Sequence, residues 1–241
     1  MTYYTGSVAA VPTANKDAYL QHAKRAWPYF QRTGALRMVE TWGDDVQPGE
    51  VTDFRRAVQA KDDESVVFSW IEWPDKATSD KAWQTMMADE DMGAKMGDMP
   101  FDGKRMIFGG FEPFIAEGTD KGAGWYQGFL TPGKPERRKD FEEMAHMAWN
   151  EMFKPSGALG SVESWGVEVP TGKVTDMYRA VNAEPGEEIV FSWSSWPDRA
   201  TCDKAAADME GGDHEMPDDM PFDGKRMVYA GFSPLYDSAA A

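Results

Sequence analysis

The sequence is poor in cysteine, because Cys202 is the only one among 241 residues. A single thiol excludes a disulfide framework within the chain and is typical of a reducing compartment. Long apolar runs are also missing: no segment has the roughly 20 apolar residues that a membrane-spanning helix needs. The segment Met1–Val11 lacks the basic and apolar regions of a secretory signal. These absences predict a soluble, cytoplasmic protein with no membrane partner.

Basic residues are also few. The chain has 25 Lys and Arg against 41 Asp and Glu, for a net charge of −16, and both halves are acidic. A field of this sign repels phosphate backbones and anionic lipid surfaces. No basic stripe with interleaved aromatic residues offsets it. The composition therefore predicts no nucleic-acid partner.

Histidine is scarce, and its pattern predicts neither a metal nor a cofactor. His22, His146 and His214 lie at positions that do not correspond between the two halves of the chain. None has the His/Cys/carboxylate spacing of a zinc site, and no symmetric pair could ligate haem. Gly109-Gly110 falls in an expected strand with no helix after it, so it does not resemble a phosphate-binding loop.

An internal repeat dominates what the sequence does contain. Trp42 recurs as Trp165, Val67–Trp70 as Val190–Trp193, and the octapeptide MPFDGKRM occurs twice. Over the three best-matched stretches, 39 of 59 positions are identical between the copies. Two copies are too few for a solenoid, but each is long enough to be a small domain.

Each copy has the order β-α-β-β-α-β of the ferredoxin-like fold. In the first copy we expect strands at 3–11, 35–42 and 104–114, a hairpin of 56–60 with 65–73, and helices at 16–32 and 75–89. Asn15 and Asp75 are the expected N-caps. The glycine-rich stretch before Trp125 is the linker candidate. We therefore expect an α+β protein with one repeat over 1–115, a linker over 116–124 and a second repeat over 125–241.

Three runs carry a resemblance to a known family: VETWGDD at 39–45, VVFSWIEWPD at 66–75 and MPFDGKRM at 99–106. With them the chain resembles the YbaA-like domain family of unknown function, in tandem copy. The resemblance implies the dimeric α/β-barrel superfamily, in which two ferredoxin-like sheets form one barrel. A chain with two copies would build that barrel as a monomeric pseudo-dimer, with further self-association left open.

Carboxylates and tryptophans at strand spacing are the candidate ligand-binding residues. Glu40 and Trp42 share one strand face, and Trp70 and Glu72 share another. If both faces line one cavity, two carboxylates meet among tryptophans, and such surroundings raise carboxyl pKa values and produce acid/base pairs. The counterparts in the second copy are Glu163, Trp165 and Trp193, while Ser195 replaces Glu72.

Arginines supply the alternative interpretations. Glu40 and Glu163 could instead pair with Arg105 and Arg226, and we favour this structural interpretation because ion pairs also gather at such positions. A second arginine pair has the same ambiguity. Arg56 and Arg179 could form a fork for an anionic substrate, or they could pair locally with Asp53 and Asp176, which is the interpretation that we favour.

Two functional hypotheses follow. In the first, the protein binds a small molecule in a cavity of the barrel, between sheet and helices, or acts as a cofactor-independent enzyme, with the more polar pocket in the first copy. In the second, it is a non-catalytic interaction or stress-related module, and the same residues are structural. The first hypothesis requires at least one carboxylate with a raised pKa in an apolar setting. The sequence identifies no catalytic residue.

Overall fold

The computed structural model describes residues 1–211 and 219–240. The strands are β1 (Tyr3–Pro12), β2 (Arg37–Asp45), β3 (Glu64–Trp73), β4 (Ile107–Gly118), β5 (Trp125–Gly133), β6 (Gly160–Glu168), β7 (Glu188–Trp196) and β8 (Val228–Asp237). The longer helices are α1 (Lys16–Arg32), α3 (Lys76–Ala88), α5 (Arg138–Met147) and α7 (Arg199–Gly211). Each half has the β-α-β-β-α-β order, so the predicted α+β fold of two ferredoxin-like repeats is confirmed.

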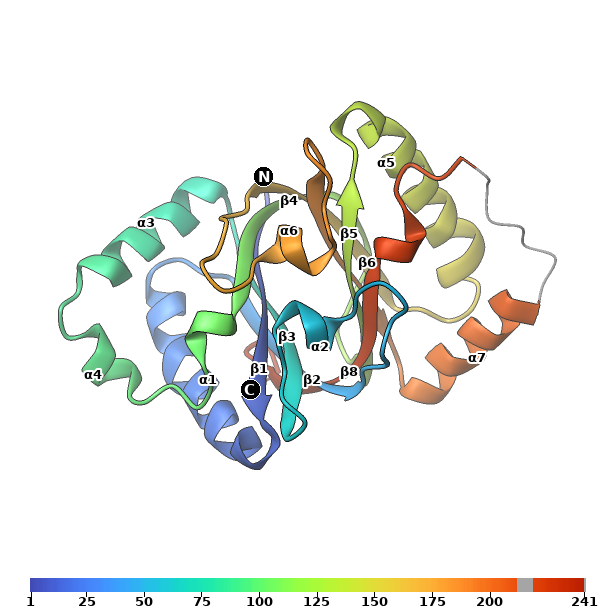
Figure 1. Cartoon of the computed structure of the whole chain (residues 1–241). Helices are drawn as coiled ribbons and strands as arrows, with labels where there is room; N and C mark the ends of the chain where they lie inside the picture. The colour runs from blue at the N-terminus through green and yellow to red at the C-terminus, as the bar shows by residue number, and fades with distance from the viewer. Residues whose placement is uncertain (212–218, 241) are drawn as a thin grey trace.

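The strands of the described residues close into one antiparallel barrel (Figure 1). Their order is β1-β3-β2-β8-β5-β7-β6-β4, so that each half contributes four neighbouring strands. The halves are joined where β2 pairs with β8 and β4 pairs with β6. The two joints have matching registers: Trp42 lies opposite Ser233, and its counterpart Trp165 lies opposite Glu112. The chain is therefore a pseudo-dimer within one polypeptide.

Aromatic rings from both halves fill the interior of the barrel. Phe68 stacks on Phe191 with ring centroids 4.4 Å apart, and Trp70 stacks on Trp193 at 4.3 Å. A strand glycine gives these rings room, because a Cβ atom on Gly6 would lie 2.7 Å from the Phe191 ring. The interior is thus a packed core, and the barrel cavity in which a ligand was expected is occupied by side chains.

The helices lie outside the barrel and at one of its ends (Figure 1). α1, α3 and the short α4 (Met92–Met96) lie on the side of the first repeat, and α5 and α7 lie on the side of the second. α2 (Phe54–Ala57) and α6 (Met177–Ala180) contact each other and bury their apolar side chains in the barrel core. This pair of short helices closes one end of the barrel.

Local capping signals explain most helix starts. Asp75 accepts a hydrogen bond from the Thr78 backbone N–H at 2.7 Å and begins α3, as predicted. Asn15 holds the N-cap position of α1 as predicted, but its side chain makes no capping bond there. The Asn15 amide donates instead to the Pro100 carbonyl at 2.8 Å and so holds the loop before β4 against α1.

The strand predicted over 56–60 is also wrong. Asp53 accepts a hydrogen bond from the Arg56 backbone N–H, and this cap begins helix α2 at that place. Gln59, with a φ of 50°, then turns the chain toward β3. Asp176 caps α6 in the same way in the second repeat. The aspartate three residues before the arginine is the signal that the hairpin interpretation overlooked.

The last strand of the first repeat is longer than expected. β4 continues to Gly118 because it pairs with β6 as far as Gly160. Residues 116–118 of the expected linker therefore belong to the barrel, and the connection between the halves is 119–124. Gly118 has a φ of 70°, a conformation that glycine adopts without strain, and there the chain leaves the strand.

The helix that covers the second half contains one inserted residue. Trp149 follows Trp27 by 122 positions, whereas Gly157 follows Gly34 by 123. The extra residue falls at the π-helical segment η4 (Ala148–Phe153), which continues α5, while α1 remains α-helical to Arg32. Widening one helical turn is a common way to absorb an insertion. The π turn therefore explains how the two repeats keep the same fold despite different helix lengths.

We expect the stacked interior rings to dominate stability. Trp70→Ala removes a side chain that is 2% exposed, leaves a cavity against Trp193 and should lower the free energy of unfolding by about 3–5 kcal/mol. Phe108→Ala is the control, because Phe108 is 46% exposed on β4 and its loss should cost less than about 1 kcal/mol. Urea unfolding followed by circular dichroism measures both. Equal losses in the two variants would contradict the assignment of the core.

Candidate functional site

Glu40 lies on the outer face of the barrel, beneath α1. Tyr19 on α1 donates its hydroxyl to Glu40 Oε2 at 2.7 Å, and the hydroxyl of Ser69 donates to the same oxygen. Ser69 lies directly opposite Glu40 on β3. Trp42 shares this face and packs with Tyr19, as the strand alternation predicts. The carboxylate is thus held between the sheet and a helix.

Glu163 occupies the equivalent place beneath α5. The hydroxyl of Ser192, directly opposite on β7, donates to Glu163 Oε2. Trp165 packs edge-on against Phe141 of α5, with ring centroids 6.1 Å apart. Phe141 stands where Tyr19 stands in the first half, so this carboxylate receives no phenol hydroxyl from its covering helix.

We call these places the helix-covered carboxylate sites. The first comprises Tyr19, Glu40, Trp42, Ser69 and Phe101, and the second comprises Phe141, Glu163, Trp165, Ser192 and Phe222.

Each helix-covered carboxylate site is built from both halves of the chain. Tyr236 of β8 lies opposite Glu40, and Ile115 of β4 lies opposite Glu163. A cation stands over each tryptophan, since Lys16 Nζ is 5.0 Å from the Trp42 ring and the Arg138 guanidinium carbon is 5.3 Å from the Trp165 ring. Closure of the barrel is therefore needed to complete either site.

Burial makes both carboxyls weaker acids than usual. The pKa of Glu40 is raised by desolvation, against which the hydrogen bonds from Ser69 and Tyr19 act. Desolvation raises the pKa of Glu163 to about 7, with only the Ser192 hydroxyl opposing it. A carboxyl with this pKa is present in both protonation states at neutral pH. Glu163 can therefore accept or donate a proton under physiological conditions.

Glu163 is also the more accessible of the two carboxyls. The Oε1 atoms of both carboxyls have no hydrogen-bond partner among the described residues, so the two groups differ in their exposure. Glu163 is half-buried, whereas Glu40 is buried, with 9% of its surface exposed. A reachable carboxyl among aromatic rings is a group that a small molecule could contact.

The predicted meeting of two carboxylates in one cavity is wrong. Trp70 and Glu72 alternate onto the inner face of β3, whereas Glu40 bonds to Ser69 on the outer face. The Trp70 side chain is instead buried in the stack with Trp193. Glu72 lies at the end of the barrel opposite Tyr4, where burial raises the pKa of the Glu72 carboxyl and the nearby Arg37 opposes that rise.

Arg37 forms an ion cluster that we did not predict. Its Nε and Nη2 atoms donate to the two oxygens of Asp237 at 2.9 and 2.7 Å, and its Nη1 atom donates to Asp120. The cluster ties β2 to the end of β8 and to the connection between the halves. Asp237 is 200 residues away in sequence, and no local pattern around Arg37 could have indicated it.

Arg105 and Arg226 do not pair with the helix-covered carboxylates, so this interpretation is corrected. Arg105 binds both oxygens of Glu64 at 2.6 and 2.7 Å, and Arg226 binds both oxygens of Glu187 at 2.6 and 2.8 Å. These bidentate pairs are buried and join the strand entry to the turn before the last strand of each repeat. They are structural pairs with different partners from those expected.

Arg56 and Arg179 form the local pairs with Asp53 and Asp176 that we favoured from the sequence. Arg56 lies 3.2 Å from Asp53, and Arg179 lies 3.5 Å from Asp176, and in both pairs the arginine side chain is more than half exposed. Both aspartates also cap short helices. The geometry is that of a local pair at a helix start.

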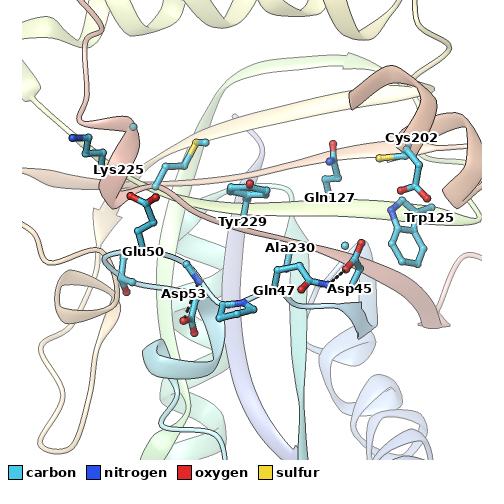
Figure 2. Close-up of a pocket in the computed structure, with 17 residues that line it drawn as sticks. Asp45, Gln47, Glu50, Asp53, Trp125, Gln127, Cys202, Lys225, Tyr229 and Ala230 are labelled. Carbon is cyan, nitrogen blue, oxygen red and sulfur yellow. Dashed lines mark hydrogen bonds between the residues drawn. The ribbon is translucent and has the colours of Figure 1, made fainter. Parts of the chain in front are cut away.

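Figure 2 shows a pocket of about 360 Å³ between the 45–53 loop of the first half and β5, β8 and α7 of the second. Three of its four acids already have partners: Asp45 and Asp203 pair with Arg199 at 2.9 and 3.2 Å, and Asp53 caps α2. Burial raises the pKa of the Cys202 thiol to about 12, which leaves it unreactive. This pocket offers a polar lining but no group poised for proton transfer, so the helix-covered carboxylate sites are the better candidates.

Neither a metal site nor a membrane-spanning helix is found in the part of the chain that the structure describes. Within residues 1–211 and 219–240, no three His, Cys, Asp or Glu side chains are placed to hold a metal ion. No helix in these ranges combines the length and the apolar character required to cross a bilayer.

Comparison with known proteins gives the family. A model of the family described as "Protein of unknown function (DUF1428)" matches residues 2–103 and again residues 124–224. The chain belongs to the DUF1428 family. The "Uncharacterized protein YbaA" of Escherichia coli (strain K12) is 56% identical over 117 residues, which are 48% of this chain and 100% of YbaA. The predicted tandem relationship to YbaA is thereby confirmed.

Solved structures share the fold of this DUF1428 protein at low sequence identity. A "Putative monooxygenase" from Fusobacterium nucleatum subsp. nucleatum ATCC 25586 aligns with a TM-score of 0.54 and 12% identity over 98% of this chain and 93% of that chain. An "anthrone oxidase-like protein" aligns with a TM-score of 0.55 and 11% identity over 98% and 92%. At such identities the likeness establishes the fold alone.

The raised pKa of Glu163 predicts a specific dependence of stability on pH. In the unfolded chain this carboxyl ionises near its ordinary pKa of 4.5, whereas in the folded protein it ionises at about 7. The folded state therefore holds the proton more tightly, and stability falls as pH rises from 4.5 through 7. Glu163→Gln should remove this loss and stabilise the protein by on the order of 2 kcal/mol at about pH 8.

The measurement is urea unfolding of both proteins from about pH 5 to pH 8. Glu151→Gln, a change of an exposed carboxyl on the same covering helix, is the control and should behave like the unchanged protein. A difference between Glu163→Gln and the unchanged protein that stays constant over this pH range would show that Glu163 titrates normally.

Proposed function

We propose that this protein binds a small apolar molecule at the second helix-covered carboxylate site and that Glu163 exchanges a proton with it. The observation that carries the proposal is the Glu163 carboxyl itself. It combines a pKa of about 7, an Oε1 atom without a donor among the described residues, and neighbouring aromatic rings. General acid/base catalysis works best when the pKa of the group lies near the working pH.

The surroundings of Glu163 favour an aromatic or other flat, apolar ligand. Phe141, Trp165 and Phe222 present ring faces and edges around the carboxyl, and Phe114 packs against the first two. Rings of this kind bind other rings through edge and offset contacts. The ligand would have to carry a weakly acidic O–H or C–H bond directed at the carboxylate.

The chemistry that we propose is a proton transfer. A bond from hydrogen to oxygen or carbon breaks in the ligand, the proton moves to Glu163, and the electron pair remains on the ligand. The Ser192 hydroxyl, which donates to Glu163 Oε2, would keep the carboxyl oriented. Proteins described as a monooxygenase and as anthrone oxidase-like share the fold, and this likeness is compatible with a small-molecule site.

The proposal can be tested with two probes. Binding of 2-naphthol is measured by ligand-observed NMR, and proton abstraction is measured as deuterium incorporation into the acidic C–H position of 2-tetralone in D₂O. We expect exchange faster than in matched buffer, and a loss of at least about tenfold in Glu163→Gln, because a positioned base contributes about 10²–10⁴-fold.

Controls separate the site from the rest of the protein. Glu151→Gln should leave both readouts unchanged, since that side chain is exposed on the outer surface. Neither binding nor accelerated exchange would contradict the proposal and favour the alternative, a non-catalytic interaction or stress-related module. Acceleration that survives Glu163→Gln would show that another group acts as the base.

Two expectations from the sequence stay predictions: that the protein has no nucleic-acid partner, and that it is cytoplasmic. The basic residues that might have formed a patch are mostly engaged within the protein. Arg55 donates to the carbonyls of Lys61 and Glu64, and Arg105 binds the Glu64 carboxylate. Their donors are therefore unavailable for phosphate contacts, and the net charge of −16 opposes approach of a polyanion.

A further inference from the structure

The two helix-covered carboxylate sites are related by the internal repeat but differ at one decisive position. Tyr19 in the first site is replaced by Phe141 in the second. Both rings lie on the covering helix, and both pack on the equivalent phenylalanine: Tyr19 on Phe101 at 5.6 Å, and Phe141 on Phe222 at 5.2 Å. On the covering helix, the difference between the sites is thus one hydroxyl group.

That hydroxyl occupies an acceptor position on the carboxylate. Tyr19 Oη donates to Glu40 Oε2 at 2.7 Å, beside the bond from Ser69. An ionised carboxylate can accept about four hydrogen bonds. Glu163 accepts one, from Ser192, among the described residues. The position that a phenol hydroxyl fills at Glu40 is therefore not filled at Glu163 by any residue that the structure describes.

The strand from the opposite half reinforces the difference. The residue opposite Glu40 is Tyr236, which is 9% exposed, whereas the residue opposite Glu163 is the smaller, fully apolar Ile115. In the first site Glu40 is buried, while in the second site Glu163 is half-buried. At these positions the second copy lacks the tyrosine hydroxyls of the first copy but keeps the carboxylate.

From these contacts we infer that the ligand of the second site is a hydroxylated aromatic molecule, and that Phe141 determines this specificity. The ligand's own phenolic or enolic O–H donates to Glu163, as Tyr19 donates to Glu40 in the first site. The first site does not take this ligand because Tyr19 already occupies the donor position on Glu40 Oε2. This inference rests on the proposed function and names the chemical class of its ligand.

The test exchanges the two residues and compares two probes of nearly the same shape. 2-Naphthol carries the hydroxyl donor, and 2-methoxynaphthalene presents the same rings without it. In the unchanged protein we expect one site and at least tenfold tighter binding of 2-naphthol. Phe141→Tyr should weaken 2-naphthol binding at least tenfold, because the new phenol takes its place on Glu163. Tyr19→Phe should add a second 2-naphthol site at Glu40. Both are measured by isothermal titration calorimetry.

Matched variants guard against simple unfolding. Phe153→Tyr adds the same hydroxyl to the same covering helix outside the site, since Phe153 packs on Trp196 with ring centroids 6.2 Å apart, and it should leave 2-naphthol binding unchanged. If Phe141→Tyr does not fold, Tyr19→Phe still decides the question, because it only removes a hydroxyl. No second site in Tyr19→Phe would contradict the inference that Tyr19 closes the first site.

The outcomes also separate this inference from the proposed function. Equal binding of the two probes, with both lost in Glu163→Gln, would overturn the hydroxyl-donor class and leave the Glu163 site standing. Unchanged 2-naphthol affinity in a folded Phe141→Tyr variant would overturn the role of Phe141. Binding of neither probe to any variant would overturn the inference and the proposed function together.

Discussion

Pairing of free sheet edges is the constraint on which this structure depends. Each four-stranded half has two edge strands, whose unpaired N–H and C=O groups are a liability in water. The β2–β8 and β4–β6 ladders satisfy those edges and at the same time bring the inner faces of the two sheets together. The stacking of Phe68 on Phe191 and of Trp70 on Trp193 follows from that closure. Edge pairing and core formation are therefore the same step, and neither half can bury its aromatic residues alone.

Because the barrel interior is filled with side chains, a reactive polar group has to lie outside it. With rings packed through the interior, the remaining places where a polar group can be both desolvated and reached lie between the barrel and its covering helices. Glu40 and Glu163 occupy those places, and each is flanked by a strand of the other half. The sites consequently depend on closure as much as the core does. Their carboxyls are weak acids because the same helices that complete the fold exclude water from them.

Features set by nearby residues were predictable from the sequence. The bounds of α1, the cap at Asp75 and the local pairing of Arg56 with Asp53 all depend on neighbours within a few positions. Alternation correctly placed Glu40 with Trp42 and Trp70 with Glu72, but it does not say which face of a strand points inward. The carboxylates of Asp120 and Asp237 that bind Arg37, and that of Glu64 that binds Arg105, lie between 41 and 200 residues away, and only the folded chain brings them together.

Because the two copies lie in one chain, the two carboxylate sites can carry different residues, which is impossible for two identical subunits. In a barrel of identical chains both sites would carry the same residues, so a tyrosine that fills one would fill the other. Here the core rings are the same in both copies, whereas Tyr19 and Tyr236 face Phe141 and Ile115 in the outer layer. Because closure needs only the conserved interior, the outer layer of one copy can lose its hydroxyls without loss of the fold. That freedom leaves Glu40 with two hydroxyl donors and Glu163 with one among the described residues.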